Sequence, residues 1–322
     1  MTAQEIAPQP RRADERAEPA PARNERPRNQ RVRKLTRADL VVVSIMVAVP
    51  TLLILVLVWF PALATVALSF TNWNGIGSIS SIQGVGATNY VNVTTNYPPF
   101  WPALQHNLIW LAALFLVATP VGMFLAVLLD KEIRFSRFYQ TAIYLPVVLS
   151  LALVGFVWQL IYSRDQGLLN AVLGTQVDWY GDPRYNLWAA LVAASWKHVG
   201  YIMLLYLAGL KAVDPSLREA AMIDGANERQ AFFRVVFPVM RPINVIVLVI
   251  TVIEALRAFD LVWVINKGRN GLETIATLVT QNVVGEASRI GFGSAMATIM
   301  LLISSVFVII YLTIVMREEK QK

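Results

Sequence analysis

The sequence has no cysteine and only two histidines, His106 and His198. The missing thiols exclude disulfides, thiol nucleophiles, cysteine-bound zinc and iron–sulfur clusters. A histidine metal site would need carboxylates brought in from elsewhere in the chain. The phosphate-binding pattern G-x-x-x-x-G-K-[ST] is missing, as are H-E-x-x-H and G-x-S-x-G. We therefore expect no enzyme, no ATP hydrolysis by this chain, and no metal or other cofactor of its own.

Charged residues are scarce as well, at 15% of the chain against 56% hydrophobic residues, and the mean hydropathy is +0.52. Ordinary soluble domains have roughly 25% charged residues, and a soluble fold of this size has too much surface to cover with so few. Residues 40–129 contain no Asp, Glu, Lys or Arg at all. This composition argues against a soluble enzyme and against a charge-rich disordered or coiled-coil protein. It favours a protein that lies largely in a membrane.

Six apolar runs are long enough to cross a bilayer, which takes about 20 helical residues for about 30 Å of hydrocarbon. We therefore predict an all-α, polytopic membrane protein with six transmembrane helices. The first run begins near residue 40 and is nearly 30 residues long, too far along the chain and too long for a cleaved signal peptide. The predicted spans are residues 40–68, 107–129, 139–162, 187–210, 243–265 and 290–316.

The basic residues set the orientation, because cytoplasmic loops carry an excess of Lys and Arg. With a cytoplasmic N-terminus, the inner segments hold 21 of the 28 Lys and Arg residues and the outer segments hold five. Both termini are therefore predicted to be cytoplasmic. Residues 1–38 are rich in Arg, Pro, Ala and Glu, and we expect a disordered basic tail that signals topology, with partner binding as the alternative. After this tail we predict a six-span membrane domain over residues 39–317 and a short cytoplasmic tail over residues 318–322.

One inner loop, residues 212–242, carries the signals of a built structure. Asp214 is suited to cap a helix, Gly225 to end it, and Asn227 to cap a second helix that Pro238 ends or bends. We expect two short helices joined by a tight turn at the cytoplasmic face. Residue chemistry alone leaves two interpretations open: a helix pair that docks into a groove of a partner, and an amphipathic helix that rests on the bilayer.

The same loop contains a recognisable motif. It reads Glu219-Ala220-Ala221, then Asp224-Gly225-Ala226, then Phe232, Pro238 and Pro242. Over about 24 positions it resembles the EAA loop of ABC-transporter permease subunits. The resemblance implies a cytoplasmic EAA-type coupling helix pair that docks into a cleft of a separate ATPase subunit. It assigns ATPase coupling to Glu219, Ala220, Ala221, Asp224, Gly225, Ala226, Phe232 and Pro238.

Other stretches are similar to the maltose-type sugar permeases, and together the similarity covers roughly residues 40–316. The sequence departs from that pattern at residues 266–271, in an outer loop, where many relatives have a Thr-Gly-Gly-Pro-type turn. The matching stretches are Leu128–Lys131, Arg137–Tyr139, Tyr144–Pro146, Trp158, Gly167–Asn170, Phe259–Val262 and Thr274.

This resemblance implies a binding-protein-dependent ABC importer in a bacterial or archaeal cytoplasmic membrane. The chain would form half of the translocation pathway for a sugar or oligosaccharide. The implied partners are a second homologous permease subunit, two copies of a cytoplasmic ATPase that bind ATP and Mg, an extracytoplasmic solute-binding protein and membrane lipid, with no nucleic acid.

Two other classes of protein remain as alternatives. A stand-alone secondary transporter or channel for a small polar solute needs inverted repeats or an intramembrane ion site, and no convincing repeat relates residues 40–162 to 187–316. A membrane-embedded enzyme needs a catalytic constellation, for which the charged residues of the fifth predicted span are the one candidate.

Charged residues inside the predicted spans point to a functional cavity. An ionisable side chain in hydrocarbon costs at least about 2.5–3.5 kcal/mol on insertion scales, so it usually faces a cavity or a partner. Three of these residues are spaced i, i+3, i+6 and share one helical face. We expect them to line or brace a translocation cavity near the midplane, beside aromatic rings suited to a sugar; the alternative is a structural salt-bridge network with ordinary packing aromatics. The substrate-pathway candidates are Trp196, Lys197, Tyr201, Glu254, Arg257 and Asp260.

Four further residues stand out within the apolar spans. His198 is expected to form an interhelical hydrogen bond rather than to bind a ligand. Asn107, Pro120 and Pro146 are polar or kinking positions, which a membrane helix tolerates where its neighbours satisfy the freed backbone groups. We expect fixed bends there, with hinges as the alternative.

Overall fold

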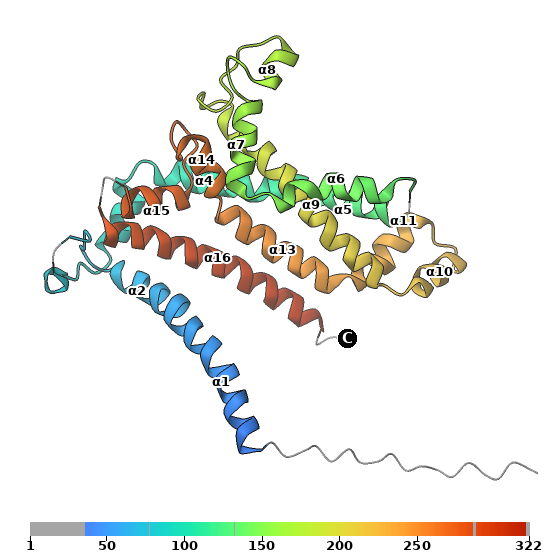
Figure 1. Cartoon of the computed structure of the whole chain (residues 1–322), viewed down its shortest axis with the longest axis horizontal. Coiled ribbons are helices and arrows are strands. Elements are labelled where there is room, and N and C mark those ends of the chain that lie inside the picture. Colours follow the sequence, from blue (N-terminus) through green and yellow to red (C-terminus); the bar gives the residue numbers. More distant parts are fainter. Residues whose placement is uncertain (1–35, 77, 132, 286–287, 320–322) are drawn as a thin grey trace, which may run out of the picture. The chain divides into compact units, whose positions relative to one another are not determined.

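The computed structural model describes residues 36–319, except residues 77, 132, 286 and 287 (Figure 1). The described chain is helical, and its one pair of extended residues is a single bridge between Thr71 and Gly84. The basic tail is predicted over residues 1–38, of which residues 1–35 lie outside the described part, as do residues 320–322. The chain divides into two compact units, Met1–Leu55 and Val56–Lys322.

The described part of the first unit is a single helix, α1 (Arg37–Ile54). Thr36 caps it, since its side chain accepts a hydrogen bond from the backbone N–H of Asp39, whose carboxylate accepts one from the N–H of Thr36 in return. None of the side chains of α1 is buried. An apolar helix with every face exposed is typical of contact with lipid or with another membrane protein.

Four helical segments are long and apolar enough to cross a membrane, and a bent helix pair makes a fifth candidate. They coincide with the first, second, fourth and sixth predicted spans. Short π-helical turns at Leu55–Trp59 and Leu114–Ala118 interrupt the first two without ending them. The four segments are Arg37–Leu68, comprising α1 and α2 (Phe60–Leu68); Phe100–Asp130, comprising α4 (Phe100–Ala113) and α5 (Thr119–Asp130); α9 (Asn186–Ala212); and Ile290–Tyr311 of α16 (Ile290–Glu319).

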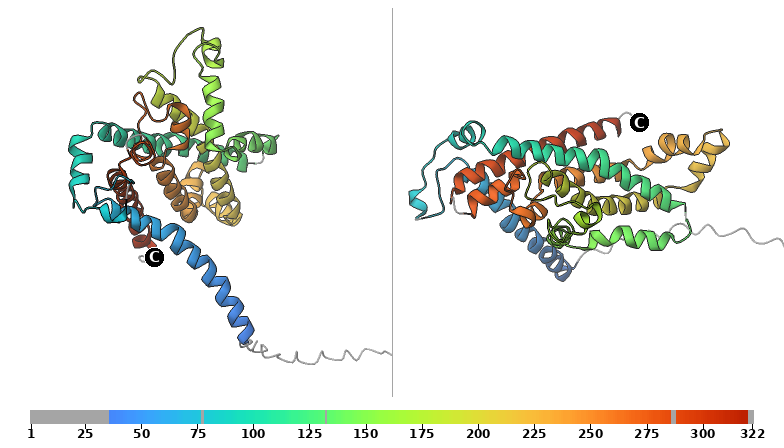
Figure 2. Two further views of the ribbon diagram at one scale, coloured as in Figure 1. Left: turned by 60° about the vertical axis from the view of Figure 1, so that its left-hand side comes forward. Right: turned by 90° about the horizontal axis from the view of Figure 1, so that it is seen from above.

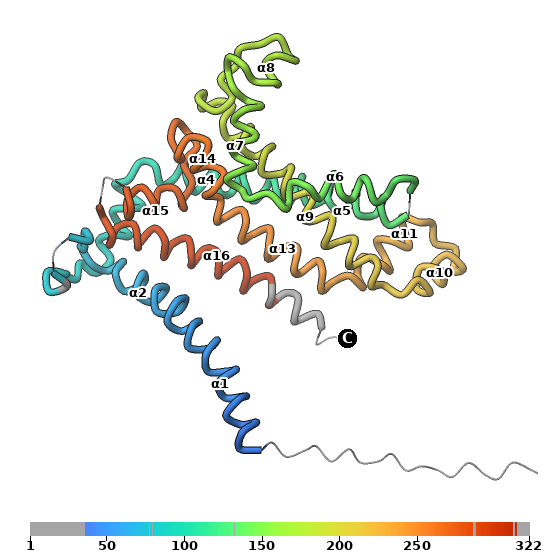
Figure 3. The backbone as a smooth tube through the Cα atoms, in the orientation of Figure 1, coloured from blue at the N-terminus to red at the C-terminus, as the bar shows by residue number. Residues whose placement is uncertain are grey.

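The predicted third span, residues 139–162, is two helices rather than one. Helices α6 (Ser136–Val148) and α7 (Leu151–Ile161) meet at an angle of 103°, which can be followed in Figure 3. Ser150 adopts an extended conformation and caps α7, accepting a hydrogen bond from the Leu153 N–H at 3.2 Å. Proline lacks a backbone N–H, so Pro146 further weakens the last turn of α6. The apolar run reveals the element, but it does not reveal this bend.

The predicted fifth span, residues 243–265, is broken as well. Helix α13 (Arg241–Leu256) has 16 residues and α14 (Asp260–Asn266) has 7. Residues 257–259 between them are not helical. The run therefore holds no single helix of spanning length, which corrects the continuous helix expected from its composition.

Connections between the long helices contain short helices that hydropathy does not predict. Several of them begin or end at a local capping signal, and α15, for example, starts at a capping box between Thr274 and Thr277. These elements are α3 (Thr88–Val91), α8 (Leu168–Leu173), α10 (Pro215–Ile223), α11 (Glu228–Ala231), α12 (Phe237–Val239) and α15 (Ile275–Val283), with a 3₁₀ turn at Ile79–Ser81 and π turns at Asn92–Asn96 and Phe232–Val236.

Close helix packing builds the core of the second unit. Helix α5 packs along α9, and α13 packs along α16 (Figure 1 and Figure 2). Gly200 lets α6 approach α9, since a Cβ there would overlap the carbonyl oxygen of Ile143. One buried cluster gathers around Trp110 and Val262, and another around Met203.

Candidate functional site

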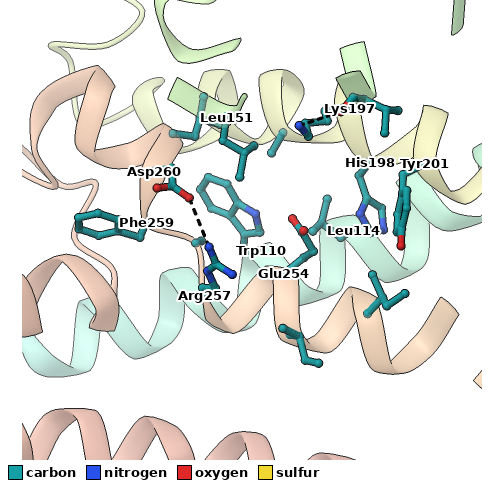
Figure 4. Close-up of a pocket in the computed structure, with 16 residues that line it drawn as sticks. Trp110, Leu114, Leu151, Lys197, His198, Tyr201, Glu254, Arg257, Phe259 and Asp260 are labelled. Carbon is teal, nitrogen blue, oxygen red and sulfur yellow. Dashed lines mark hydrogen bonds and ion pairs between the residues drawn. The ribbon is translucent and has the colours of Figure 1, made fainter. Parts of the chain in front are cut away.

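A cavity of about 440 Å³ lies among α4, α9, α13 and α14 (Figure 4). This volume is within the range of small-molecule sites, roughly 300–1,000 Å³. Its wall combines apolar side chains, three kinds of aromatic ring and four charged groups. The lining residues are Trp110, Leu114, Val147, Leu151, Ala194, Lys197, His198, Tyr201, Ile250, Ile253, Glu254, Arg257, Ala258, Phe259, Asp260 and Leu261.

The cavity lies at the two helix breaks. Val147 and Leu151 come from the α6–α7 bend, and residues 257–261 come from the α13–α14 break. Backbone carbonyls freed by a break inside a membrane must find donors, because each unsatisfied group costs several kcal/mol there. A polar side chain from a neighbouring helix supplies the donor at each break.

Lys197 of α9 supplies it at the first break. Its ammonium donates to the carbonyl oxygen of Val147 at 3.2 Å and also to that of Leu149. Lys197 therefore lines the cavity and braces the bend at the same time. Those two bonds hold the half-buried ammonium at the bend, on the wall of the cavity that Glu254 and Asp260 also line.

Asn107 of α4 supplies the donor at the second break. Its side-chain amide donates to the carbonyl oxygens of Ala255 at 3.0 Å and Leu256 at 3.2 Å, the last residues of α13. Its side-chain oxygen accepts a hydrogen bond from the Ile275 N–H at 3.0 Å, in the first turn of α15. Asn107 is fully buried, so one amide joins α4, α13 and α15. It ends a neighbouring helix rather than bending its own.

The three charges near the end of α13 do not form the continuous face that their spacing predicts. Arg257 and Asp260 lie in and after the break, and their nearest side-chain atoms are 3.9 Å apart. Arg257 is 73% exposed. Glu254 forms no ion pair within the described chain, and Figure 4 shows its carboxylate directed into the cavity. The cavity thus offers one unpaired carboxylate and one loosely paired guanidinium.

The structure brings five of the six pathway candidates together and leaves one outside. Trp196 is not part of the lining; it lies edge-on to Trp158 with ring centroids 5.8 Å apart. His198 forms the expected interhelical bond, in which its Nε2 lies 3.2 Å from the Thr251 hydroxyl of α13. Sequence reasoning missed Trp110 and Phe259 as lining residues, since an apolar ring in an apolar helix carries no signal of which face it occupies.

The loop at residues 212–242 folds as its capping signals predict. The Asp214 side chain accepts a hydrogen bond from the Ser216 N–H at 2.9 Å and caps α10, and this bond lowers the pKa of Asp214 below its ordinary value. Gly225 ends the turn with φ of +85°, a conformation that glycine adopts without strain. Asn227 caps α11 in a capping box with Gln230. Helical structure continues past Pro238, after the π turn.

The residues with an expected coupling role divide into an outer and an inner set. Glu219, Ala220, Asp224, Gly225 and Pro238 are exposed, whereas Ala221 is buried and Ala226 and Phe232 are half-buried. Ile223, beside them, is 86% exposed. The loop therefore presents a mixed apolar and acidic surface and uses its remaining side chains to pack against the rest of the chain.

An ionic cluster fastens this loop to the end of α5. The Asp130 side chain is only 10% exposed and lies 3.4 Å from Lys211 of α9 and 3.4 Å from Arg218 of α10. Lys131 pairs with Glu228 at 2.6 Å, and this contact lowers the pKa of the Glu228 carboxyl. A hollow of about 440 Å³ lies beside the cluster, between α5 and the loop. The sequence does not single out Asp130 as a partner of the loop.

Comparison with known proteins agrees with this architecture. Residues 118–320, well over half of the chain, match the family described as binding-protein-dependent transport system inner membrane component. A probable ABC transporter permease of Pyrococcus horikoshii is 31% identical over 276 residues, covering 83% of this chain and 94% of that protein. The xylose/arabinose import permease of Haloferax volcanii is 32% identical over 246 residues, covering 74% and 76%.

Among solved structures, a bacterial ABC transporter involved in the import of the acidic polysaccharide alginate superposes with a TM-score of 0.74 and 20% identity. The superposition covers 87% of this chain and 96% of that one. The fold, the apolar helices and the family match lead to one conclusion: this chain is a multi-pass membrane protein that belongs to the inner membrane components of binding-protein-dependent transport systems.

Proposed function

We propose that this chain is a permease subunit of an ATP-driven importer and forms half of the pathway for a sugar or oligosaccharide that a binding protein delivers. The observation that carries the proposal is the cavity between the two helix breaks, where charged and aromatic side chains meet. Relatives named for xylose and arabinose, starch degradation products and arabinooligosaccharides support the class of cargo.

The proposed topology has six spans with both termini in the cytoplasm of a bacterial or archaeal cell. The α6–α7 pair and the α13–α14 pair then count as one span each. The distribution of 21 inner and five outer basic residues supports this orientation. Broken helices are tolerated at membrane depth where their backbone lines a cavity or is buried in protein, which is the situation of both pairs.

Energy comes from separate subunits in this proposal. The exposed set Glu219, Ala220, Asp224 and Gly225 docks into a cleft of the ATPase that binds ATP and Mg, and the ionic cluster at Asp130 passes the movement on to α5 and α9. The complete importer contains a second homologous permease, two ATPase copies and the extracytoplasmic binding protein. The folded, fastened loop supports this division of labour, because a mobile loop would transmit little force.

The cavity chemistry suits a polyhydroxylated ligand. The half-buried rings of Tyr201 and Phe259 offer surfaces against which the C–H face of a sugar packs. Glu254 accepts hydrogen bonds from hydroxyl groups, and Arg257 donates them. The Lys197 ammonium is occupied by backbone carbonyls, so we assign it to bracing rather than to the sugar.

Transport by the reconstituted complex tests the proposal. Glu254→Gln should lower sugar uptake without reducing assembly with the ATPase, because Glu254 has no structural ion pair to lose. The matched control is Asp165→Asn, an exposed carboxylate in an outer loop, which should leave uptake unchanged. Equal uptake by the Glu254 variant and the control, or sugar uptake by the purified chain alone, would contradict the proposal and favour a stand-alone carrier.

A further inference from the structure

A second polar hollow, of about 370 Å³, lies where the segment after α2 meets the start of α16. It shares no lining residue with the cavity in Figure 4. Its wall is rich in amides and aromatic rings and contains one cation. The lining residues are Thr71, Asn72, Trp73, Asn74, Asn89, Asn92, Asn96, Tyr97, Arg289 and Phe292.

Short backbone contacts fix the shape of this hollow. The Gly291 N–H donates to the carbonyl oxygen of Trp73 at 2.8 Å, and a Cβ at Gly291 would overlap the carbonyl oxygen of Thr71. The Asn89 side chain donates to the carbonyl oxygens of Ser69 at 2.8 Å and Thr71 at 2.7 Å. The segment is therefore held against α16, and the hollow is a built part of the fold.

Several polar groups in the wall have unused hydrogen-bonding capacity. The Trp73 indole N–H is buried and has no partner in the described chain. The Asn96 amide donates to the Asn92 side-chain oxygen at 2.9 Å, which leaves the carbonyl of Asn96 and the NH₂ of Asn92 for a ligand. Arg289 forms no ion pair with any described residue, and no carboxylate among the described residues lines the hollow.

These groups define the chemistry of the ligand. Side-chain amides both donate and accept, as each sugar hydroxyl requires, and Tyr97 packs edge-on to Phe292 with ring centroids 5.3 Å apart, so an apolar surface lies beside the amides. A guanidinium without a carboxylate partner favours an acidic ligand group, to which its hydrogen bonds are charge-assisted.

We propose that this hollow is a second saccharide site, sized for one or two sugar rings, that binds an acidic sugar more tightly than its neutral counterpart. Its position outside the membrane rests on the proposed function, since the orientation assigns residues 70–106 to the outer face. There the site holds a sugar unit before it enters the cavity between the helix breaks.

Binding to the full-length permease in nanodiscs, without the binding protein, tests the site. The probes are digalacturonate and its neutral counterpart galactobiose, followed by saturation-transfer NMR. We expect both to bind, with digalacturonate about tenfold tighter, the ratio by which a charge-assisted hydrogen bond exceeds a neutral one. Arg289→Gln should remove this preference and Arg289→Lys should restore part of it, while Asn96→Ala should weaken both sugars. Arg164→Gln removes an exposed cation of another outer loop and should change neither.

Three outcomes would overturn the site: wild-type protein that binds neither probe, a preference for digalacturonate that survives Arg289→Gln, or, in a separate measurement with the binding protein added, an Arg289 variant that loses only its affinity for that protein. The last would make the hollow a protein-docking surface. Glu254→Gln keeps this result separate from the pathway, because that variant should lose uptake and retain probe binding. A failed uptake experiment would leave the binding measurement intact.

Discussion

Replacing Asp130 with asparagine removes the negative charge that lies between Lys211 and Arg218 and leaves the side-chain volume nearly unchanged. Two unit charges 3.4 Å apart attract each other by about 5 kcal/mol at an effective dielectric constant near 20. Lys211 and Arg218 are 52% and 43% exposed, so hydration offsets much of this attraction. We take about 2 kcal/mol as the net loss, between the values for exposed and buried pairs.

A loss of about 2 kcal/mol raises the population of loops detached from α5 about 30-fold. Glu219 and Asp224 are unchanged in this variant, so binding of the ATPase should persist. A detached loop would not transmit the movement of the ATPase to α5 and α9, so fewer ATPase cycles would move these helices. We expect the ATP hydrolysed per sugar imported to rise several-fold in proteoliposomes that contain the whole complex, while the amount of copurified ATPase stays the same.

Two further variants make this result interpretable. Asp130→Glu restores the charge and should recover most of the coupling. Glu228→Gln breaks the neighbouring ion pair with Lys131. The Glu228 side chain is 74% exposed and the Lys131 side chain 49%, and exposed ion pairs contribute little to stability, so this variant should change the ATP hydrolysed per sugar imported only slightly. An unchanged ratio in Asp130→Asn, or a larger effect from Glu228→Gln, would refute the assignment of the anchor.

Three other predictions concern stability and local order. Asn107→Leu leaves two carbonyls and one N–H without partners inside the protein, and we expect a loss of about 3 kcal/mol or more, visible as a lower unfolding temperature in detergent. Gly225→Ala forces a Cβ into a left-handed turn at a cost of about 1–2 kcal/mol and should reduce copurification of the ATPase, whereas alanine at the exposed position Asn227, whose backbone is extended, removes a cap but strains no backbone and should reduce it less. Because the pKa of Asp214 is lowered, its cap is fully present above the ordinary pKa of 3.8 and is lost as the pH falls through the lowered pKa. Hydrogen exchange of the α10 backbone amides should speed up in that pH range. Asp214→Asn, which still caps the helix, should remove this pH dependence.

Local sequence signals predicted the parts of the fold that local physics determines. Apolar length located four spanning helices, and Asp214, Gly225 and Asn227 marked the ends of α10 and α11, because a cap is an interaction between residues two or three positions apart. The two breaks were not predictable in this way. An apolar run indicates burial in lipid and carries no information on straightness, which depends here on Lys197 and Asn107 reaching carbonyls far away in the sequence.

The candidate site shows the same division. Ionisable residues in an apolar run must face something polar, so Lys197, Glu254 and Asp260 could be placed at a cavity before the structure was known. Trp110 could not, since a tryptophan on an apolar helix fits lipid, core and cavity equally well. Asp130 was also missed, because an acidic residue at a helix end looks solvated until the partners that surround it are seen.

The two helix breaks are fastened by tethers of unequal stiffness. Asn107 has a short side chain whose three bonds leave α13 and α15 little freedom to separate from α4. Lys197 holds the α6–α7 elbow with an ammonium on four methylene groups, so it can keep its carbonyl contacts while the angle changes. When the importer alternates between its outward-open and inward-open forms, we expect the elbow to act as the moving joint and the asparagine junction to act as its fixed pivot.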